Sequence, residues 1–433
     1  MRVKIVLGFF FGLSSTTALG DDLFDIFQIA SQNDPTYAAA IQEYNAAKQA
    51  SPKAWSSALP QLNLQGSHTE VYDESRNGSA GEDYDRDQYA LTLTQTIYNK
   101  AQFDAISQAG YQVLQAEANY ANARHDLIIR VAERYFNILS EQANLVFAKA
   151  EKKAIAQQLD QAKQRFNVGL TAITDVHEAQ ARYDQAVAQE IEAQRLYDIS
   201  LESLREVTGQ VHTTLATVNE QHTFVAPEPN SIDAWVTTAL DNNLQLKAAQ
   251  SNVEIARESK GIANAGHYPT LDLEATYSDS DSSGGQFGAF ETDQTSVALV
   301  LNIPIFAGGG VNANSREAAA LYQQSKELYE QQRRITEREA RNSYLTVISS
   351  ISQVNALKQA LISTQTALEA TKAGFEVGTR TAVDVLDSQR EMYRAQRNYI
   401  RARHDYIVNT LRLKQAAGTL VDEDVKLINA WLG

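Results

Sequence analysis

Two carboxylates near the C-terminal end of the chain have the spacing of a shared helix face. Asp384 and Asp387 are three residues apart, and residues three apart are neighbours on a helix surface. Carboxylates gathered around an opening attract cations and repel anions, so a ring of them is a selectivity device. Helix capping or solvation is the ordinary use of a single pair. The elements that carry the pair therefore decide whether it can act on ions.

The chain lacks the residue spacings that catalysis or metal binding requires. Its histidines lie at 68, 125, 177, 212, 222, 267 and 404, and no two of them have the spacing of metal ligands. There is neither a phosphate-binding glycine loop nor a nucleophile elbow. The sequence therefore predicts that the protein is not an enzyme, uses no cofactor and has no structural metal site.

The N-terminus predicts export. The chain has 433 residues and a formal charge of −15, a balance that argues against nucleic-acid binding. Residues 1–20 have the layout of a secretory signal peptide: basic Arg2 and Lys4, an apolar stretch at 5–13, and small residues up to Gly20. We expect cleavage after Gly20, the alternative being a buried N-terminal helix. After residue 20 no run of 18 apolar residues occurs, so no transmembrane helix is expected.

One short stretch occurs twice, at 166–176 and 375–385, with Phe, Val, Gly, Asp and Val at the same positions. A single glycine between long glycine-free runs indicates a tight turn between two helices. Gly169 and Gly378 can adopt the left-handed conformation that ends a helix. Thr174 and Asp175 in the first copy, and Thr381 and Asp384 in the second, suit the start of the next helix. Each stretch therefore predicts the tip of a helical hairpin.

The repetition extends over the whole chain at an offset of about 209 residues, as in Pro60-Gln-Leu-Asn-Leu64 and Pro269-Thr-Leu-Asp-Leu273. A period of this length indicates a doubled domain rather than a solenoid. The predicted organisation is a signal peptide at 1–20, a first repeat at 21–208, a linker or equatorial segment at 209–231, a second repeat at 232–418 and a C-terminal equatorial segment at 419–433.

Each repeat predicts a helix, two strands and a long helical hairpin. Residues 22–57 have helical spacing, interrupted near Pro35 and Pro52, and the runs 111–168 and 311–373 contain neither Gly nor Pro. Runs of this length form rods of about 90 Å, with apolar residues spaced as in coiled coils. Shorter helices return over 173–207 and 382–417. A soluble coiled-coil protein would account for these helices but not for the strands.

Four segments alternate apolar residues with Thr, Asn, Gln or Asp, as a wall between lipid and water requires. They are 60–72 and 88–98, then 271–277 and 297–303, with acidic loops expected at 73–87 and 278–294. Four strands cannot close a barrel, whereas three chains would supply 12. A small soluble sheet that covers a helix bundle is the alternative.

These motifs resemble the TolC family of outer-membrane efflux and secretion channels. The resemblance is carried by Arg165-Phe-Asn-Val-Gly-Leu170 with Ala172-Ile-Thr-Asp-Val176, by Val377-Gly-Thr-Arg-Thr381 with Val383-Asp-Val-Leu-Asp387, and by Pro304-Ile-Phe-Ala-Gly-Gly309. It implies an α+β membrane protein with two internal repeats: a homotrimer with a 12-stranded outer-membrane β-barrel that continues into a long periplasmic α-helical coiled-coil barrel. It also implies an exit duct that receives cargo from an inner-membrane pump through a periplasmic adaptor, and that opens by iris-like untwisting of the helical tips.

The resemblance assigns roles to particular residues. Asp384 and Asp387 correspond to the acidic ring at the aperture, so three chains would gather six carboxylates. Arg380 corresponds to a residue that holds the closed state by a link to Thr174 and Asp175, where this chain has Phe375 in place of a tyrosine that joins the link. The adaptor-docking tips would be Val168, Gly169 and Leu170 with Val377, Gly378 and Thr379; a local staple between helices is the alternative use of Leu170.

Two other interpretations of the sequence stay open. One is a periplasmic adaptor, which also has helical hairpins but lacks four amphipathic strands. The other is a trimeric coiled-coil surface stalk without a pore, which needs no internal repeat. The chain also ends at Trp431-Leu-Gly433, short of the polar tail expected from the resemblance, which predicts a smaller equatorial band.

Overall fold

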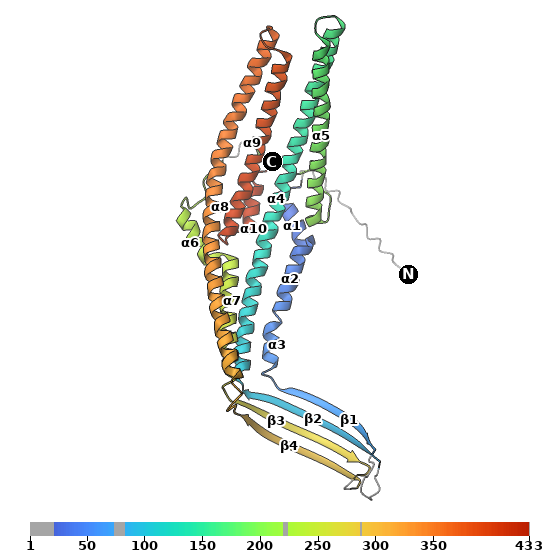
Figure 1. The fold of residues 1–433 in the computed structure, drawn as a ribbon, viewed down its shortest axis with the longest axis vertical. Coiled ribbons are helices and arrows are strands. Elements are labelled where there is room, and N and C mark those ends of the chain that lie inside the picture. Colours follow the sequence, from blue (N-terminus) through green and yellow to red (C-terminus); the bar gives the residue numbers. More distant parts are fainter. Residues whose placement is uncertain (1–20, 73–82, 220–223, 286–287, 433) are drawn as a thin grey trace, which may run out of the picture. The chain divides into compact units, whose positions relative to one another are not determined.

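The structure is a computed structural model that describes residues 21–72, 83–219, 224–285 and 288–432. The signal peptide predicted at 1–20 lies outside these residues. The same order of elements occurs twice, short helices being followed by two strands and a hairpin of long helices (Figure 1). The helices are α1 (Leu23–Asn33), α2 (Pro35–Ala47), α3 (Ala50–Ser56), α4 (Lys100–Asn167), α5 (Ile173–Thr208), α6 (Ile232–Asn242), α7 (Leu244–Ala265), α8 (Gly310–Glu376), α9 (Ala382–Ala416) and α10 (Asp422–Asn429). The strands are β1 (Gln61–Val71), β2 (Tyr84–Tyr98), β3 (Thr270–Ser282) and β4 (Phe290–Asn302).

Most element boundaries follow the sequence pattern, but β2, β3 and β4 are longer than the strands predicted. β2 begins at Tyr84, inside the loop predicted to run to residue 87, and β3 and β4 extend into the loop predicted at 278–294. The prediction of these loops was too long because it ended each strand where apolar residues ended, whereas backbone pairing continues through polar residues. The rest of the first predicted loop, 73–82, lies outside the described residues. α4 also continues through Gly110, because a single glycine costs a 68-residue helix little.

The contacts within the chain divide it into two units. The first contains residues 1–38, 124–239 and 339–433, and the second contains 39–123 and 240–338. Both sequence repeats contribute to each unit, and α4 and α8 have residues in both. The hairpin tips therefore lie in the first unit and the sheet lies in the second.

The second unit carries one antiparallel sheet in the order β1-β2-β3-β4, whose strands lie side by side in Figure 1. Register pairs Leu62 with Leu93 and Leu64 with Leu91. It also pairs Leu271 with Leu301 and Leu273 with Leu299. Alternate residues share a face of a strand, so these leucines form one apolar face, on which Leu64 is 75 % exposed.

Helices of the second unit are joined by aromatic and polar contacts. The rings of Tyr44 on α2 and Tyr120 on α4 stack with centroids 5.2 Å apart. On the other side of α4, the Gln108 amide donates to the Ser259 hydroxyl of α7 at 2.6 Å. No helix in the described ranges combines the length and the apolar content that crossing a membrane requires.

The core of the first unit lies at the base of the hairpins, away from their tips, where they meet the short helices. Tyr135 and Phe136 of α4 are fully buried together with Ile407 and Leu411 of α9 and Leu204 of α5. Ion pairs lie at the edges of this core, such as the one between Arg412 Nη2 and Glu133 Oε1, which are 2.7 Å apart. This packing fixes the base of each hairpin, whereas smaller contacts such as the buried cluster of Leu145, Ala148 and Ala193 hold the helices together farther out.

His404 lies inside that core and makes the stability of this unit depend on pH. Its Nδ1 is 2.8 Å from the Ser140 hydroxyl, and burial, with Arg403 adding a smaller effect, lowers the pKa of His404 to about 3. An unfolded histidine has a pKa of about 6.5. As the pH falls from about 6.5 towards 3, the unfolded chain binds a proton that the folded chain rejects, so the free energy of unfolding decreases by up to about 1.4 kcal/mol per pH unit.

We therefore expect the melting temperature in detergent to fall between pH 7.5 and pH 5, and His404→Gln to flatten that dependence. Circular dichroism at both pH values measures it. The control is His177→Gln, which removes an exposed imidazole and should leave the slope unchanged. An identical slope in His404→Gln would show that another group causes the effect.

Candidate functional site at the tips of the helical hairpins

The two tips have the same backbone conformation. Gly169 and Gly378 have φ angles of 76° and 80°, the left-handed region in which a side chain is unfavourable. The N–H groups of Gly169 and Leu170 donate to the carbonyls of Phe166 and Arg165, both at 2.9 Å. The second tip repeats this pattern, which is the Schellman motif that closes a helix end. The predicted turns at both glycines are therefore confirmed.

Apolar side chains at both tips face solvent. Val168 and Leu170 are 69 % and 77 % exposed, and Val377 of the second tip is 76 % exposed. The staple expected as the alternative for Leu170 would bury that side chain between helices, and an exposure of 77 % argues against it. Gly169, Gly378 and Thr379 complete the two turns, so each tip presents backbone and a small apolar surface together.

Asp384 belongs to a capping box at the start of α9. Its Oδ2 accepts from the backbone N–H of Thr381 at 2.8 Å, while the Asp384 N–H donates to the Thr381 hydroxyl at 3.2 Å. The hydrogen bond from that backbone N–H holds the pKa of Asp384 below its usual value. The capping role considered from the sequence is therefore present, and the carboxylate stays ionised at neutral pH.

The first tip begins its second helix differently. The residue before α5 is Ala172, whose side chain cannot cap. The Asp175 carboxylate is bonded within its own turn instead, accepting from the hydroxyl of Thr171 and, at 3.5 Å, from that of Thr174. From the sequence we expect Thr174 and Asp175 to suit the start of α5, and both residues lie in its first turn.

Asp387 makes a contact between the two hairpins that the sequence did not predict. The Arg182 guanidinium of α5 contacts the Asp387 carboxylate of α9, with Nη1 and Oδ1 3.1 Å apart. Arg390 of α9 approaches the same oxygen at 3.6 Å. The two arginines place positive charge within 4 Å of Asp387, whereas Asp384 is held mainly by the neutral Thr381 cap, with Arg380 adding a smaller electrostatic effect. The relative position of helices from different repeats is set by how they pack, so no spacing in the sequence indicates that Arg182 and Asp387 meet.

Arg380 and Phe375 face a cavity between the tips that is also lined by Asp175 and Thr171. Three of the four residues expected to hold the closed state, Asp175, Phe375 and Arg380, thus line one cavity, and Thr174 is not among the lining residues. The link from Arg380 itself stays a prediction. Phe375 makes a different contact between hairpins, because the Arg165 guanidinium lies over its ring at 5.9 Å. Gly374 leaves room for Arg380, since a Cβ there would lie 2.8 Å from the Arg380 Cγ.

Comparison with known proteins gives a consistent picture. The model of the family described as "Outer membrane efflux protein" matches residues 26–210 and 235–419. The chain is 36 % identical over 424 residues to the outer membrane protein TolC of Vibrio cholerae serotype O1, covering 97 % of this chain and 96 % of the relative. It is 30 % identical over 435 residues to the alkaline protease secretion protein AprF of Pseudomonas aeruginosa, covering 98 % and 90 %.

The fold is that of solved outer-membrane channels. The crystal structure of the Campylobacter jejuni CmeC outer membrane channel superposes with a TM-score of 0.81, covering 94 % of this chain and 89 % of that one at 17 % identity. At such identity the likeness concerns the fold alone. It extends over both repeats of the chain.

Proposed function

Because the chain belongs to the outer membrane efflux protein family, whose members are outer-membrane channels and not enzymes, we propose that it is an exit duct. It passes drugs, small molecules or secreted proteins from inner-membrane pumps across the periplasm and the outer membrane. The family is described as one of efflux proteins, and the relative from Pseudomonas aeruginosa is a protease secretion protein, so efflux and secretion are the two kinds of transport to consider.

The exposed leucine face of the sheet is the observation that carries this proposal. A soluble sheet covers such a face with helices, whereas here the leucines of the outer strands β1 and β4 are exposed and Leu93, Leu271 and Leu273 are only half-buried. The other face carries Asn63, Thr92 and Thr276 in register. An apolar face backed by a polar face is the pattern of a wall between lipid and water. Since four strands cannot close, three chains would form one 12-stranded barrel, with the helical hairpins extending into the periplasm.

The hairpin tips are the gate and the docking surface in this proposal. The exposed apolar residues Val168, Leu170 and Val377 would receive a periplasmic adaptor, which in turn engages the pump. Contacts between the hairpins, from Arg182 to Asp387 and from Arg165 to Phe375, would hold the closed state. Untwisting of the helices breaks these contacts and opens the duct in the manner of an iris.

Asp384 and Asp387 would form the acidic ring at the aperture. Three chains bring six carboxylates to one opening, where they attract cations. Because Arg182 and Arg390 approach Asp387, Asp384 would supply most of the uncompensated negative charge. Asp384 and Asp387 therefore contribute different amounts of negative charge to the ring, and substitution of one at a time can distinguish their effects.

Single-channel recording tests the function directly. Purified mature protein in a planar bilayer should give small, long-lived current steps, and a divalent cation should block them from one side only. Absence of steps from folded, trimeric protein would favour a stalk or an adaptor. Those two alternatives predict protein that stays in solution without detergent and runs on gels without heat-dependent migration, because neither needs to cover an exposed leucine face.

Phe375→Tyr tests the closed-state link. The new hydroxyl would face the cavity that Asp175 and Arg380 line, and one added hydrogen bond is worth about 1 kcal/mol per chain. We expect a lower open probability in single-channel recordings. The control is Phe166→Tyr at the equivalent position of the first tip, which is 39 % exposed and should change nothing. Unchanged opening in Phe375→Tyr would mean that the phenylalanine does not weaken the gate.

A further inference from the structure

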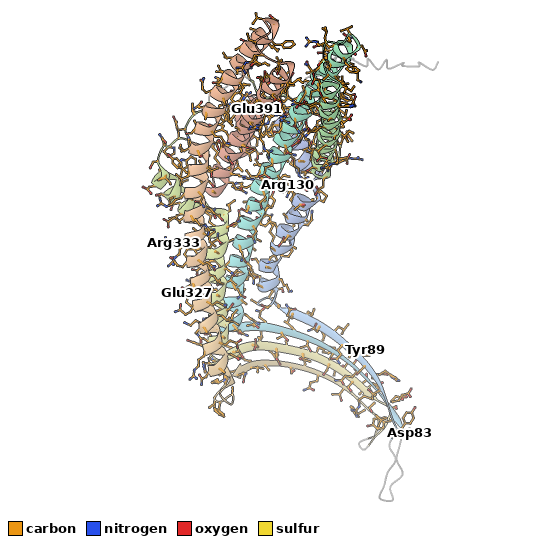
Figure 2. The ribbon with its side chains drawn as sticks, turned by 45° about the horizontal axis from the view of Figure 1, so that its top comes forward. Asp83, Tyr89, Arg130, Glu327, Arg333 and Glu391 are labelled. Carbon is orange, nitrogen blue, oxygen red and sulfur yellow. The ribbon has the colours of Figure 1, made fainter. Side chains whose placement is uncertain are left out.

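The apolar face of the sheet ends in a cluster of metal-ligating side chains. Beyond Tyr89, which Figure 2 labels on β2, the positions that continue this face are His68 and Glu70 on β1 and Asp85 and Asp87 on β2. The register sets His68 directly opposite Asp87 and Glu70 directly opposite Asp85. Two residues from each strand therefore make a square on one face.

Three of these side chains can reach one ion. The ligand atoms of His68, Glu70 and Asp85 all lie within 4.8 Å of one another. His68 Nε2 is 3.9 Å from Glu70 Oε1. Atoms at such separations can bind a common metal with bonds of about 2.0–2.2 Å after small side-chain rotations. One imidazole nitrogen and two carboxylate oxygens is a donor set found in zinc sites.

Asp87 has the position of an orienting carboxylate. Its Oδ1 lies 2.7 Å from His68 Nδ1, so in its neutral form the ring donates its Nδ1–H to Asp87 and presents the Nε2 lone pair to a ligand. Metal-bound histidines usually have such a partner, which fixes the tautomer and makes the ligating nitrogen more basic. The imidazole is thus prepared for metal binding on the side that Glu70 and Asp85 occupy.

The pairing of Glu70 with Asp85 is unfavourable without a cation. Like charges directly opposite each other in an antiparallel pair destabilise the sheet. The Tyr72 hydroxyl donates to Glu70 Oε2 at 2.7 Å but carries no charge, and His68 lies closer to Asp87 than to Glu70. We propose that His68, Glu70 and Asp85 bind a divalent transition-metal ion of the zinc class, with Asp87 positioning the imidazole and water completing the coordination. The nitrogen ligand favours this class over Mg²⁺ or Ca²⁺, which prefer oxygen.

The sheet offers an internal comparison. On the same face, Asp281 of β3 lies opposite Asp87 on one side and opposite Glu291 of β4 on the other. Asp281 and Glu291 form a carboxylate pair that the described structure groups with no histidine. If carboxylates alone attracted the metal, this second pair would bind as well as the first. The proposal rests on the geometry of β1 and β2 and does not depend on what passes through the channel.

Calorimetric titration of the purified full chain in detergent with Zn²⁺ tests the site, and visible absorption with Co²⁺ reports the ligands. We expect one tight site per chain. His68→Gln should weaken binding at least about 100-fold and Asp87→Asn about 10–100-fold, with the Co²⁺ spectrum altered in both. Glu291→Gln and His177→Gln should bind as the wild type does.

Two results would overturn the proposal. Equal affinity in the wild type and His68→Gln would exclude an imidazole ligand at this position. Weakening by Glu291→Gln as large as that by Glu70→Gln would mean that the metal binds a diffuse acidic surface only. Heat-dependent gel migration of every variant serves as the check that each one folds, so a failure of binding is separate from a failure of folding.

Discussion

Reversing the charge of Arg182 should raise the open probability of the channel. The guanidinium lies 3.1 Å from Asp387 across the two hairpins, and glutamate there would replace attraction by repulsion. The pair is partly exposed, at 29 % and 46 %, so its loss is worth only about 1 kcal/mol per chain. In the proposed trimer three chains act on one aperture, and the combined change should increase the ratio of open to closed states at least about tenfold. Single-channel dwell times measure that ratio directly.

Two controls separate this contact from a general effect of charge. Arg182→Glu combined with Asp387→Arg restores an opposite-charge pair and should return the open probability towards that of the wild type. Arg195→Glu reverses another arginine of α5, whose partner Glu192 lies on the same helix, and should leave gating unchanged. If Arg182→Glu and Arg195→Glu open the channel equally, the contact with Asp387 does not hold the gate.

The hairpin tips were predictable because their signals are local. A glycine between two long helical runs requires a left-handed turn, and both Gly169 and Gly378 adopt it. The capping box of Thr381 and Asp384 is also a matter of short spacing. The contact between Arg182 and Asp387 was not predictable, since these residues are 205 positions apart and meet only through the packing of two helices. The contact of Arg165 with Phe375 was not predictable for the same reason.

The sheet illustrates the same division between local and distant information. Alternation identified the apolar face from residues such as Leu62 and Leu64, but β2, β3 and β4 were predicted too short because polar residues such as Asp85 were assigned to loops. Register then sets His68 opposite Asp87 and Glu70 opposite Asp85. A search of the sequence for pairs of histidines misses this group, since its ligands come from two strands and include only one imidazole.

Neutralising the acidic pair should abolish the one-sided block by divalent cations, and the two positions should contribute unequally. Arg182 and Arg390 lie 3.1 and 3.6 Å from the Asp387 carboxylate, so part of its field is already compensated. Asp384 is bonded to neutral Thr381, with a smaller electrostatic effect from Arg380, and its lowered pKa keeps it ionised at neutral pH. We therefore expect Asp384→Asn to weaken the block more than Asp387→Asn does. The double variant should weaken it at least about tenfold, because six carboxylates are lost from one aperture.

Asparagine is the appropriate replacement because its side-chain oxygen can still accept from the Thr381 N–H and preserve the cap. Thr381→Ala is the matched control, since it removes the capping hydroxyl, costs about 1 kcal/mol of helix stability and leaves both carboxylates charged. Its block should equal that of the wild type. If Asp387→Asn has the larger effect, Arg182 does not compensate Asp387 in the working channel. The contact between the hairpins would then have to break whenever the aperture conducts, so that block and gating would report two different conformations of the same pair.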